Sequence, residues 1–180
     1  CREIVVAAGA LQSPAMLMRA GIGDAADLKR LGIEIAADRH GVGRNLQEHP
    51  SIALCAWIAP HARMGAHPRR HLQMAMRFSS GLPGMPRNDM YVQVVAKSAW
   101  HPIGKRIGTL FGWINRPYST GRVKLVSASP ADYPDVAFEL LSDPRDFARM
   151  RDCVRRMAAF YATPALRAAA SPPFAATHGT

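Results

Sequence analysis

The spacing of hydrophobic and polar residues predicts a strand followed by a helix at the start of the chain. Glu3–Ala8 (EIVVAA) is a short apolar run that ends at Gly9, which is typical of a strand buried on both faces of a parallel sheet. Ser13-Pro14 supplies an N-cap and a first helical residue. A helix is therefore predicted from there to the turn at Gly21–Gly23.

Shorter elements are predicted in the next thirty residues. Asp24 is placed to begin a second short helix, which Gly32 would end. Ile33–Ala36 alternates as an edge strand does. Gly41–Pro50 contains two glycines and a proline, so it is predicted to be a loop.

The middle of the chain is predicted to be rich in strands. The exception is Arg70–Ser79, where Leu72, Met76 and Phe78 fit the apolar side of a helix. A hairpin connection is predicted at Arg116–Gly121, between the strands on either side of it. Strands are predicted at five places: Ser51–Ile58, Met90–Ala96, Thr109–Asn115, Arg122–Val126 and Val136–Phe138.

The last third carries the strongest helical pattern. The pattern begins at Asp143-Pro144, an N-cap followed by a proline, and ends at Thr163-Pro164. Residues 166–180 are rich in Ala and Pro and lack periodicity, so this tail can be disordered. Five apolar residues recur along the helix at i, i+3 and i+4 spacing: Phe147, Met150, Val154, Met157 and Tyr161.

Together these elements predict an α+β fold. A βα-type beginning gives way to several strands and one long helix, so the edge of a nucleotide-binding fold is expected to lead into an antiparallel-sheet domain.

Composition narrows the class of protein. The chain is 48% hydrophobic and 20% charged, so it can bury a core and is not expected to be disordered. Its formal charge of +10 is compatible with nucleic-acid binding. However, the basic residues are scattered and no aromatic residues interleave with them, so we do not expect this chain to bind nucleic acid. No run approaches about 18 apolar residues, so no membrane span is predicted. Three distant cysteines predict neither a zinc site nor disulfides, and a cytoplasmic location is expected.

Three separated blocks of sequence form a more specific pattern. The first is Ala8–Pro14 (AGALQSP), followed by Leu17 and Ala20–Gly23 (AGIG). The second is Gly41–His49 (GVGRNLQEH), and the third is Arg116–Leu125 (RPYSTGRVKL). In this order they resemble the glucose–methanol–choline (GMC) oxidoreductases, of the choline dehydrogenase-like or alcohol dehydrogenase-like kind. The chain departs from the family pattern at Ala20, usually Ser, and at Glu48, usually Asp.

The resemblance implies a flavoenzyme. It implies an FAD-dependent oxidoreductase that oxidises the CH–OH group of a small-molecule alcohol, with hydride transfer to the flavin. Residues 1–50 would belong to a Rossmann-like FAD-binding domain and residues 51–165 to a substrate-binding domain. The chain contains no GxGxxG after a strand and no C-terminal catalytic histidine segment. It is therefore expected to be an internal fragment of a longer enzyme, and inactive alone.

The resemblance also implies candidate site residues. It places Gly9, Ala10, Asn45 and Leu46 near the FAD, and His49 on the flavin or substrate side. A glycine lets a ligand approach the backbone closely, although Gly9-Ala10 also fits ordinary strand-to-helix packing. Asn45 could instead stabilise its own loop as an Asx turn, and His49 could be a structural histidine. The alternative is that the chain is a non-catalytic remnant domain that binds no flavin. A basic nucleic-acid-binding module is a second, less favoured alternative.

Overall fold

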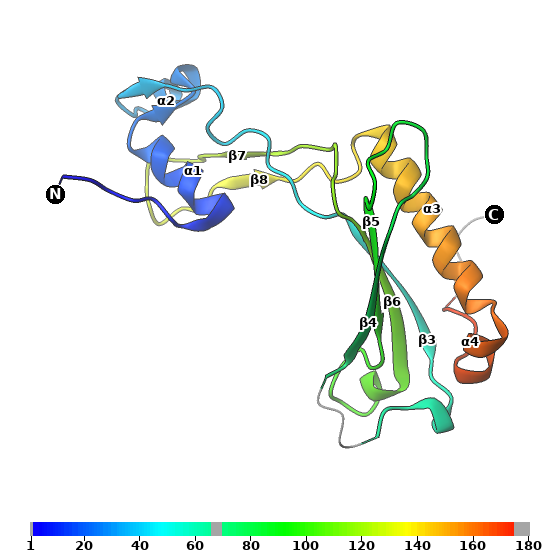
Figure 1. Ribbon diagram of the computed structural model, residues 1–180. Helices are drawn as coiled ribbons and strands as arrows, with labels where there is room; N and C mark the ends of the chain where they lie inside the picture. Colours follow the sequence, from blue (N-terminus) through cyan, green and yellow to red (C-terminus); the bar gives the residue numbers. More distant parts are fainter. Residues whose placement is uncertain (1, 66–69, 175–180) are drawn as a thin grey trace. The chain divides into compact units, whose positions relative to one another are not determined.

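The computed structural model describes residues 2–65 and 70–174, and its contacts divide the chain into two units (Figure 1). Unit 1 comprises Cys1–Glu48 and Ser119–Ser142, and unit 2 comprises His49–Tyr118 and Asp143–Thr180. Residues 119–142 are predicted from the sequence to belong to the domain that follows residue 50. In the structure this segment belongs to unit 1, because Val123 is part of that unit's core.

Unit 1 consists of two helices and two pairs of short strands. β1 pairs with β2 in parallel, and β7 pairs with β8 antiparallel. The elements are α1 (Gly9–Arg19), β1 (Ile22–Gly23), α2 (Ala25–Arg30), β2 (Ala37–Asp38), β7 (Arg122–Lys124) and β8 (Asp135–Ala137).

The core of unit 1 joins its two sequence segments. Met18 of α1, Leu28 of α2 and Val123 of β7 are each at most 5% exposed and pack in one cluster. Gly43 lies against the same strand, where the Val123 amide donates to the Gly43 carbonyl oxygen at 2.7 Å. A Cβ on Gly43 would stand 2.3 Å from the Val123 carbonyl oxygen, so this close approach requires glycine.

Unit 2 is an antiparallel sheet with one long helix against it. The strand order is β3-β6-β5-β4, with β3 and β4 at the edges. The strands are β3 (Ser51–Trp57), β4 (Leu72–Phe78), β5 (Met90–Val95) and β6 (Ile107–Ile114). The helices are α3 (Pro144–Tyr161), α4 (Pro164–Ala169) and the 3-10 turns η1 (Pro60–Ala62) and η2 (Gly104–Arg106).

Helix α3 packs closely on the central strand β6. Met150, Cys153 and Met157 are at most 5% exposed on the helix side of the sheet. Full burial of a side chain of methionine's size stabilises a fold by roughly 1.5–3 kcal/mol. Gly112 of β6 permits the approach, since a Cβ there would stand 2.7 Å from the Cys153 Sγ. The Tyr161 hydroxyl donates to the Leu54 carbonyl oxygen at 3.1 Å and so ties the end of the helix to β3.

Most predicted elements are present. Helix α2, strands β3, β5, β6, β7 and β8, and helix α3 lie within two residues of their predicted bounds. The α+β class with an antiparallel sheet is confirmed. No helix in the described part of the chain is long and apolar enough to cross a membrane.

The predictions for the first forty residues need three corrections. Glu3–Ala8 is not a strand: Ile4 and Val5 are 80% and 83% exposed, and among the described residues no strand pairs with this segment. Helix α1 begins at Gly9 and not at Ser13, whose hydroxyl instead accepts the Ala8 amide. The strand predicted at 33–36 lies at Ala37–Asp38, where β1 offers backbone partners.

Two later predictions are also wrong. Residues 72–78 form strand β4 and not a helix, because they pair with β5. The segment 116–121 is no hairpin: β7 pairs with β8 and not with β6, and the Asp146 carboxylate binds the Tyr118 amide. Helix α3 is present as predicted, and on it Phe147 is 55% exposed, whereas the charged Asp146 and Arg149 are buried.

The tail is structured as far as the structure describes it. Residues 164–169 form α4, and Ala170 bridges to Ile58. The Phe174 amide donates to the Cys55 carbonyl oxygen at 2.7 Å. This stretch therefore supplies hydrogen-bond partners to backbone groups along the open edge of β3. Residues 175–180 lie outside the described residues.

Candidate functional site

Unit 1 contains a hollow where three of the predicted cofactor contacts meet. It has a volume of about 230 Å³ and lies between the start of α1, the loop after Val42 and strand β7. Eight residues line it: Ala10, Pro14, Gly43, Arg44, Asn45, Leu46, Gln47 and Val123. The structure thus brings Ala10, Asn45 and Leu46 together, and Gly9 directly precedes the first of them.

The loop that forms one side of the hollow is fixed by backbone contacts. Leu46 and Gly121 exchange two backbone hydrogen bonds, at 3.1 and 2.7 Å. Asn45 has a φ of 55°, a left-handed conformation that asparagine tolerates better than most residues. Among the described residues no group hydrogen-bonds to the Asn45 side chain, so an Asx turn does not account for this asparagine.

Gly9 is a glycine for conformational reasons. Its φ is +82°, which side chains rarely adopt, and a Cβ there would meet nothing within 4 Å. Among the described residues, nothing packs against this position.

His49 lies at the beginning of unit 2, and one of its nitrogens is held by the backbone. Its Nδ1 is 2.8 Å from the Ile114 carbonyl oxygen at the end of β6. A carbonyl oxygen only accepts hydrogen bonds, so Nδ1 carries a proton. In the neutral ring Nε2 is then the basic nitrogen. A neutral imidazole of this tautomer can accept a proton from a hydroxyl group at Nε2.

The sheet face opposite α3 carries a cluster of aromatic rings that is not among the site residues predicted from the sequence. The Tyr91 and Trp113 rings stack with centroids 4.1 Å apart, and the Phe111 ring lies 5.6 Å from Trp113. The Trp113 indole nitrogen donates to the Asn115 side-chain oxygen at 3.1 Å. The alternation Phe111-Gly112-Trp113 within a predicted strand was the signal for a shared face.

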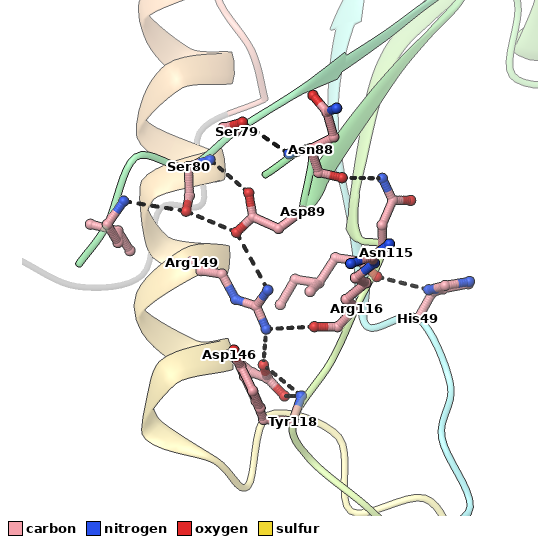
Figure 2. A network of polar contacts seen from close by, with 12 residues as sticks. His49, Ser79, Ser80, Asn88, Asp89, Asn115, Arg116, Tyr118, Asp146 and Arg149 are labelled. Carbon is pink, nitrogen blue, oxygen red and sulfur yellow. Dashed lines mark hydrogen bonds and ion pairs between the residues drawn. The ribbon is translucent and has the colours of Figure 1, made fainter. Parts of the chain in front are cut away.

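Unit 2 also contains a buried charged cluster that was not predicted from the sequence (Figure 2). Asp89, Asp146 and Arg149 are all 0% exposed. The Arg149 guanidinium lies between the two carboxylates: Nη1 is 3.4 Å from Asp89, and Nη2 donates to Asp146. The i, i+3 spacing of Asp146 and Arg149 on α3 signalled a pair, but nothing local signalled Asp89.

The start of α3 is held by an exposed ion pair. The Asp143 carboxylate caps the helix by accepting the Arg145 amide at 2.8 Å and also binds the Arg145 guanidinium at 2.6 and 2.9 Å. These bonds lower the pKa of Asp143 to about 2, the side-chain bond being the largest cause. The Arg145 guanidinium lies 3.6 Å over the Tyr118 ring, so the cap also contacts the segment that leaves β6.

Comparison with known proteins gives concordant results. Residues 1–51 and 117–179 match two family models, both described as GMC oxidoreductase. A 5-(hydroxymethyl)furfural oxidase of Methylovorus sp. (strain MP688) is 46% identical over 169 residues, which cover 92% of this chain and 31% of that protein. An oxygen-dependent choline dehydrogenase of Rhizobium meliloti (strain 1021) is 31% identical over 180 residues, covering 86% of this chain and 32% of that protein.

The fold also matches a solved structure. The crystal structure of pyridoxine 4-oxidase from Mesorbium loti superposes with a TM-score of 0.81 at 23% identity, covering 96% of this chain and 35% of that one. The chain thus spans about a third of the length of these proteins. The resemblance seen in the three sequence blocks is confirmed: the chain belongs to the GMC oxidoreductases, a family of FAD flavoproteins.

Proposed function

We propose that this chain is part of an FAD-dependent oxidoreductase that oxidises the CH–OH group of an alcohol. The hollow of unit 1 carries the proposal, because residues selected from the sequence as cofactor contacts line one surface there. FAD, when bound, supplies the acceptor for the hydride. The chain's own residues bind and orient the reacting groups.

The residues of the hollow fit a nucleotide-bearing cofactor. Arg44 brings a cationic group and Asn45 a side-chain amide without a partner among the described residues. The open backbone at Gly9 admits close approach, and Leu46 supplies apolar contact. We therefore assign Gly9, Ala10, Asn45 and Leu46 to FAD binding.

We assign His49, at the beginning of unit 2, to a position near the flavin or the substrate. The bond from Nδ1 to the Ile114 carbonyl oxygen orients the ring and leaves Nε2 as the basic nitrogen. Such a nitrogen can hold the hydroxyl hydrogen of an alcohol or take its proton. General bases of this kind typically contribute 10²–10⁴-fold to a rate, to order of magnitude.

The aromatic face of unit 2 supports a substrate with a flat unsaturated ring. Tyr91 and Trp113 already stack at 4.1 Å, with Phe111 beside them, and a flat ring can extend such a stack. The relative at 46% identity is a 5-(hydroxymethyl)furfural oxidase, whereas the choline dehydrogenases are about 31% identical. We therefore propose that the substrate is an alcohol whose CH–OH group is attached to an aromatic ring. A quaternary ammonium alcohol such as choline is the less favoured substrate.

The test begins with the DNA on both sides of the coding stretch. We expect the upstream frame to encode a strand–GxGxxG–helix and the downstream frame a histidine-containing segment. The protein of that longer frame should then purify with visible flavin absorbance and oxidise an aryl-methanol faster than choline. Stop codons on either side, or a colourless inactive protein, would favour the non-catalytic remnant.

A pair of asparagine variants tests the hollow itself. Asn45→Ala removes an amide that lines the hollow, and Asn88→Ala removes an asparagine with the same φ of 55° in unit 2. Both changes impose similar backbone strain, so the difference between them reports ligand contact. We expect only Asn45→Ala to weaken FAD binding in titrations of the apoprotein. Equal effects would remove Asn45 from the cofactor site.

A further inference from the structure

The charged cluster of unit 2 is costly to bury, so its arrangement calls for a physical explanation. Asp89, Asp146 and Arg149 are fully buried, and the Arg149 Nε has no hydrogen-bond partner among the described residues. Buried ion pairs seldom stabilise a fold more than well-packed apolar residues of similar size. What the cluster does provide is a fixed geometry, because guanidinium and carboxylate groups bind in defined directions.

The cluster fixes the stretch of chain that leaves strand β6. Arg149 Nη2 donates to the Arg116 carbonyl oxygen at 2.8 Å. Both oxygens of Asp146 accept the Tyr118 amide, at 2.9 and 3.1 Å. The backbone on both sides of Pro117 is therefore held from α3 (Figure 2).

The cluster also fixes the end of β6 from the other side. The Asp89 carboxylate accepts both the amide and the hydroxyl of Ser80, each at 2.8 Å. The Asp89 backbone oxygen in turn accepts the Asn115 amide at 2.8 Å. Asn115 is thus held next to the cluster by a bond that does not involve its own side chain.

Two candidate site residues depend on this same stretch. The Asn115 side-chain oxygen accepts the Trp113 indole N–H at 3.1 Å, which sets the edge of the aromatic stack. The Ile114 carbonyl oxygen accepts the His49 Nδ1–H at 2.8 Å, which sets the orientation and tautomer of that ring. Figure 2 shows the bond from Arg149 to Arg116 and, separately, the bond that holds His49; the backbone of residues 114–116 connects them.

We propose that Arg149, with Asp89 and Asp146, is a positioning group for the substrate side of the site. The buried cluster fixes residues 114–118, and these residues place the Trp113 ring and hold His49 in its Nδ1–H form. The proposal rests on the proposed function in one respect, namely that Trp113 and His49 lie near the substrate. The positional claim itself concerns unit 2 alone and is testable without flavin or substrate.

The experiment follows Trp113 as the single tryptophan in the full chain, with Trp57 and Trp100 changed to Phe. Arg149→Lys keeps the charge but has a single ammonium that cannot bridge two carboxylates and a carbonyl as a guanidinium does. We expect unchanged far-UV circular dichroism, a red-shifted Trp113 emission and acrylamide quenching raised about twofold, as for a locally loosened site. Nitrogen-15 NMR of His49 should show a mixture of tautomers.

A matched control and a second variant keep the result decisive. Arg155→Lys makes the same change at an exposed arginine of α3 and should leave both signals at parent values. Asn115→Ala breaks the link to Trp113 without disturbing a buried charge, so it should shift the Trp113 signals alone and not the His49 tautomer. A folded Arg149→Lys with parent signals overturns the proposal. If that variant does not fold, an unchanged Trp113 in Asn115→Ala overturns it.

The proposed function is tested separately in the longer flavoprotein. There, Arg149→Lys should raise KM for the alcohol more than it lowers kcat. The reason is that displacement of the Trp113 ring weakens substrate binding before it affects the chemical step. If the longer protein does not oxidise alcohols, the proposed function is wrong. The effect of Arg149 on Trp113 and His49 would still be established by the measurements on this chain. Changes in activity without changes in Trp113 or His49 would contradict the positioning role.

Discussion

Gly121 lies where two backbone segments of unit 1 meet more closely than a side chain allows. A Cβ at this position would stand 1.9 Å from the Ala137 carbonyl oxygen, and backbone atoms cannot yield as a flexible side chain can. We expect Gly121→Ala to lower the free energy of unfolding of unit 1 by about 1–3 kcal/mol or more, the usual cost of overpacking. Hydrogen exchange at the amides of Leu46 and Val123 measures the effect.

Gly41 offers the matched control for that change. Its backbone has no positive φ, and a Cβ there would meet nothing within 4 Å. Gly41→Ala should therefore leave the same amides protected as in the parent. If both variants exchange alike, the close approach at Gly121 does not govern the stability of unit 1.

Cys153 illustrates how burial alone controls the reactivity of a residue. Its thiol is 0% exposed against Gly112, and desolvation raises its pKa to about 11. The thiolate is the reactive form, so Cys153 should resist iodoacetamide at pH 8 while the half-buried Cys55 is alkylated at a measurable rate. Peptide mass spectrometry reports both sites, and alkylation of Cys153 at the rate of Cys55 would contradict the packing of α3.

At the scale of an element, the start of α3 should respond to acid. The folded-state pKa of Asp143 is lowered from 3.8 to about 2, chiefly by the Arg145 side chain, so this carboxyl ionises more easily in the folded state. Its contribution to stability is therefore fully present above the unfolded pKa of 3.8 and is lost as the pH falls through about 2.

Asp143→Asn isolates this acid response, because asparagine still caps a helix but does not titrate. We expect the parent to lose stability between about pH 4 and pH 2 through a component that the variant lacks. Urea unfolding at a series of pH values, followed by circular dichroism, measures both proteins. Parallel curves across this range would show that the Asp143–Arg145 pair does not stabilise α3.

The elements also show which sequence signals were sufficient. Helices α2 and α3 were predictable because each begins at an aspartate whose side chain accepts amides of the first turn. Strand β4 was not, because Leu72 and Met76 fit either a helix or a strand. Met74 and Phe78 continue the alternation with period two, and pairing with β5 then decides the outcome. Long-range pairing is the information that a local pattern lacks.

The same limit applies to the candidate site. Asn45 and Leu46 could be selected because they stand together in one loop motif, and the structure places them with Ala10 in one hollow. The buried cluster could not be found, because Asp89 meets Arg149 sixty residues along the chain. A polar residue in a loop and a charged residue on a helix are both ordinary until the fold removes them from water.

At the scale of the whole molecule, each unit has its own core, and the two can be followed separately. All three tryptophans, Trp57, Trp100 and Trp113, belong to unit 2, so tryptophan fluorescence reports the unfolding of unit 2 alone. The amides of Leu46 and Val123 report unit 1. Compact units with separate cores commonly unfold as separate cooperative steps.

Two glycine variants test this independence reciprocally. Gly121→Ala disturbs unit 1, and Gly112→Ala disturbs unit 2, where a Cβ would stand 2.7 Å from the Cys153 Sγ. We expect Gly121→Ala to accelerate exchange of the unit 1 amides while the urea midpoint of tryptophan fluorescence stays at the parent value. Gly112→Ala should do the reverse, lowering the fluorescence midpoint without exposing those amides. If each variant moved both signals equally, the chain would unfold as one cooperative body, because only a shared transition transmits a local clash to the other core.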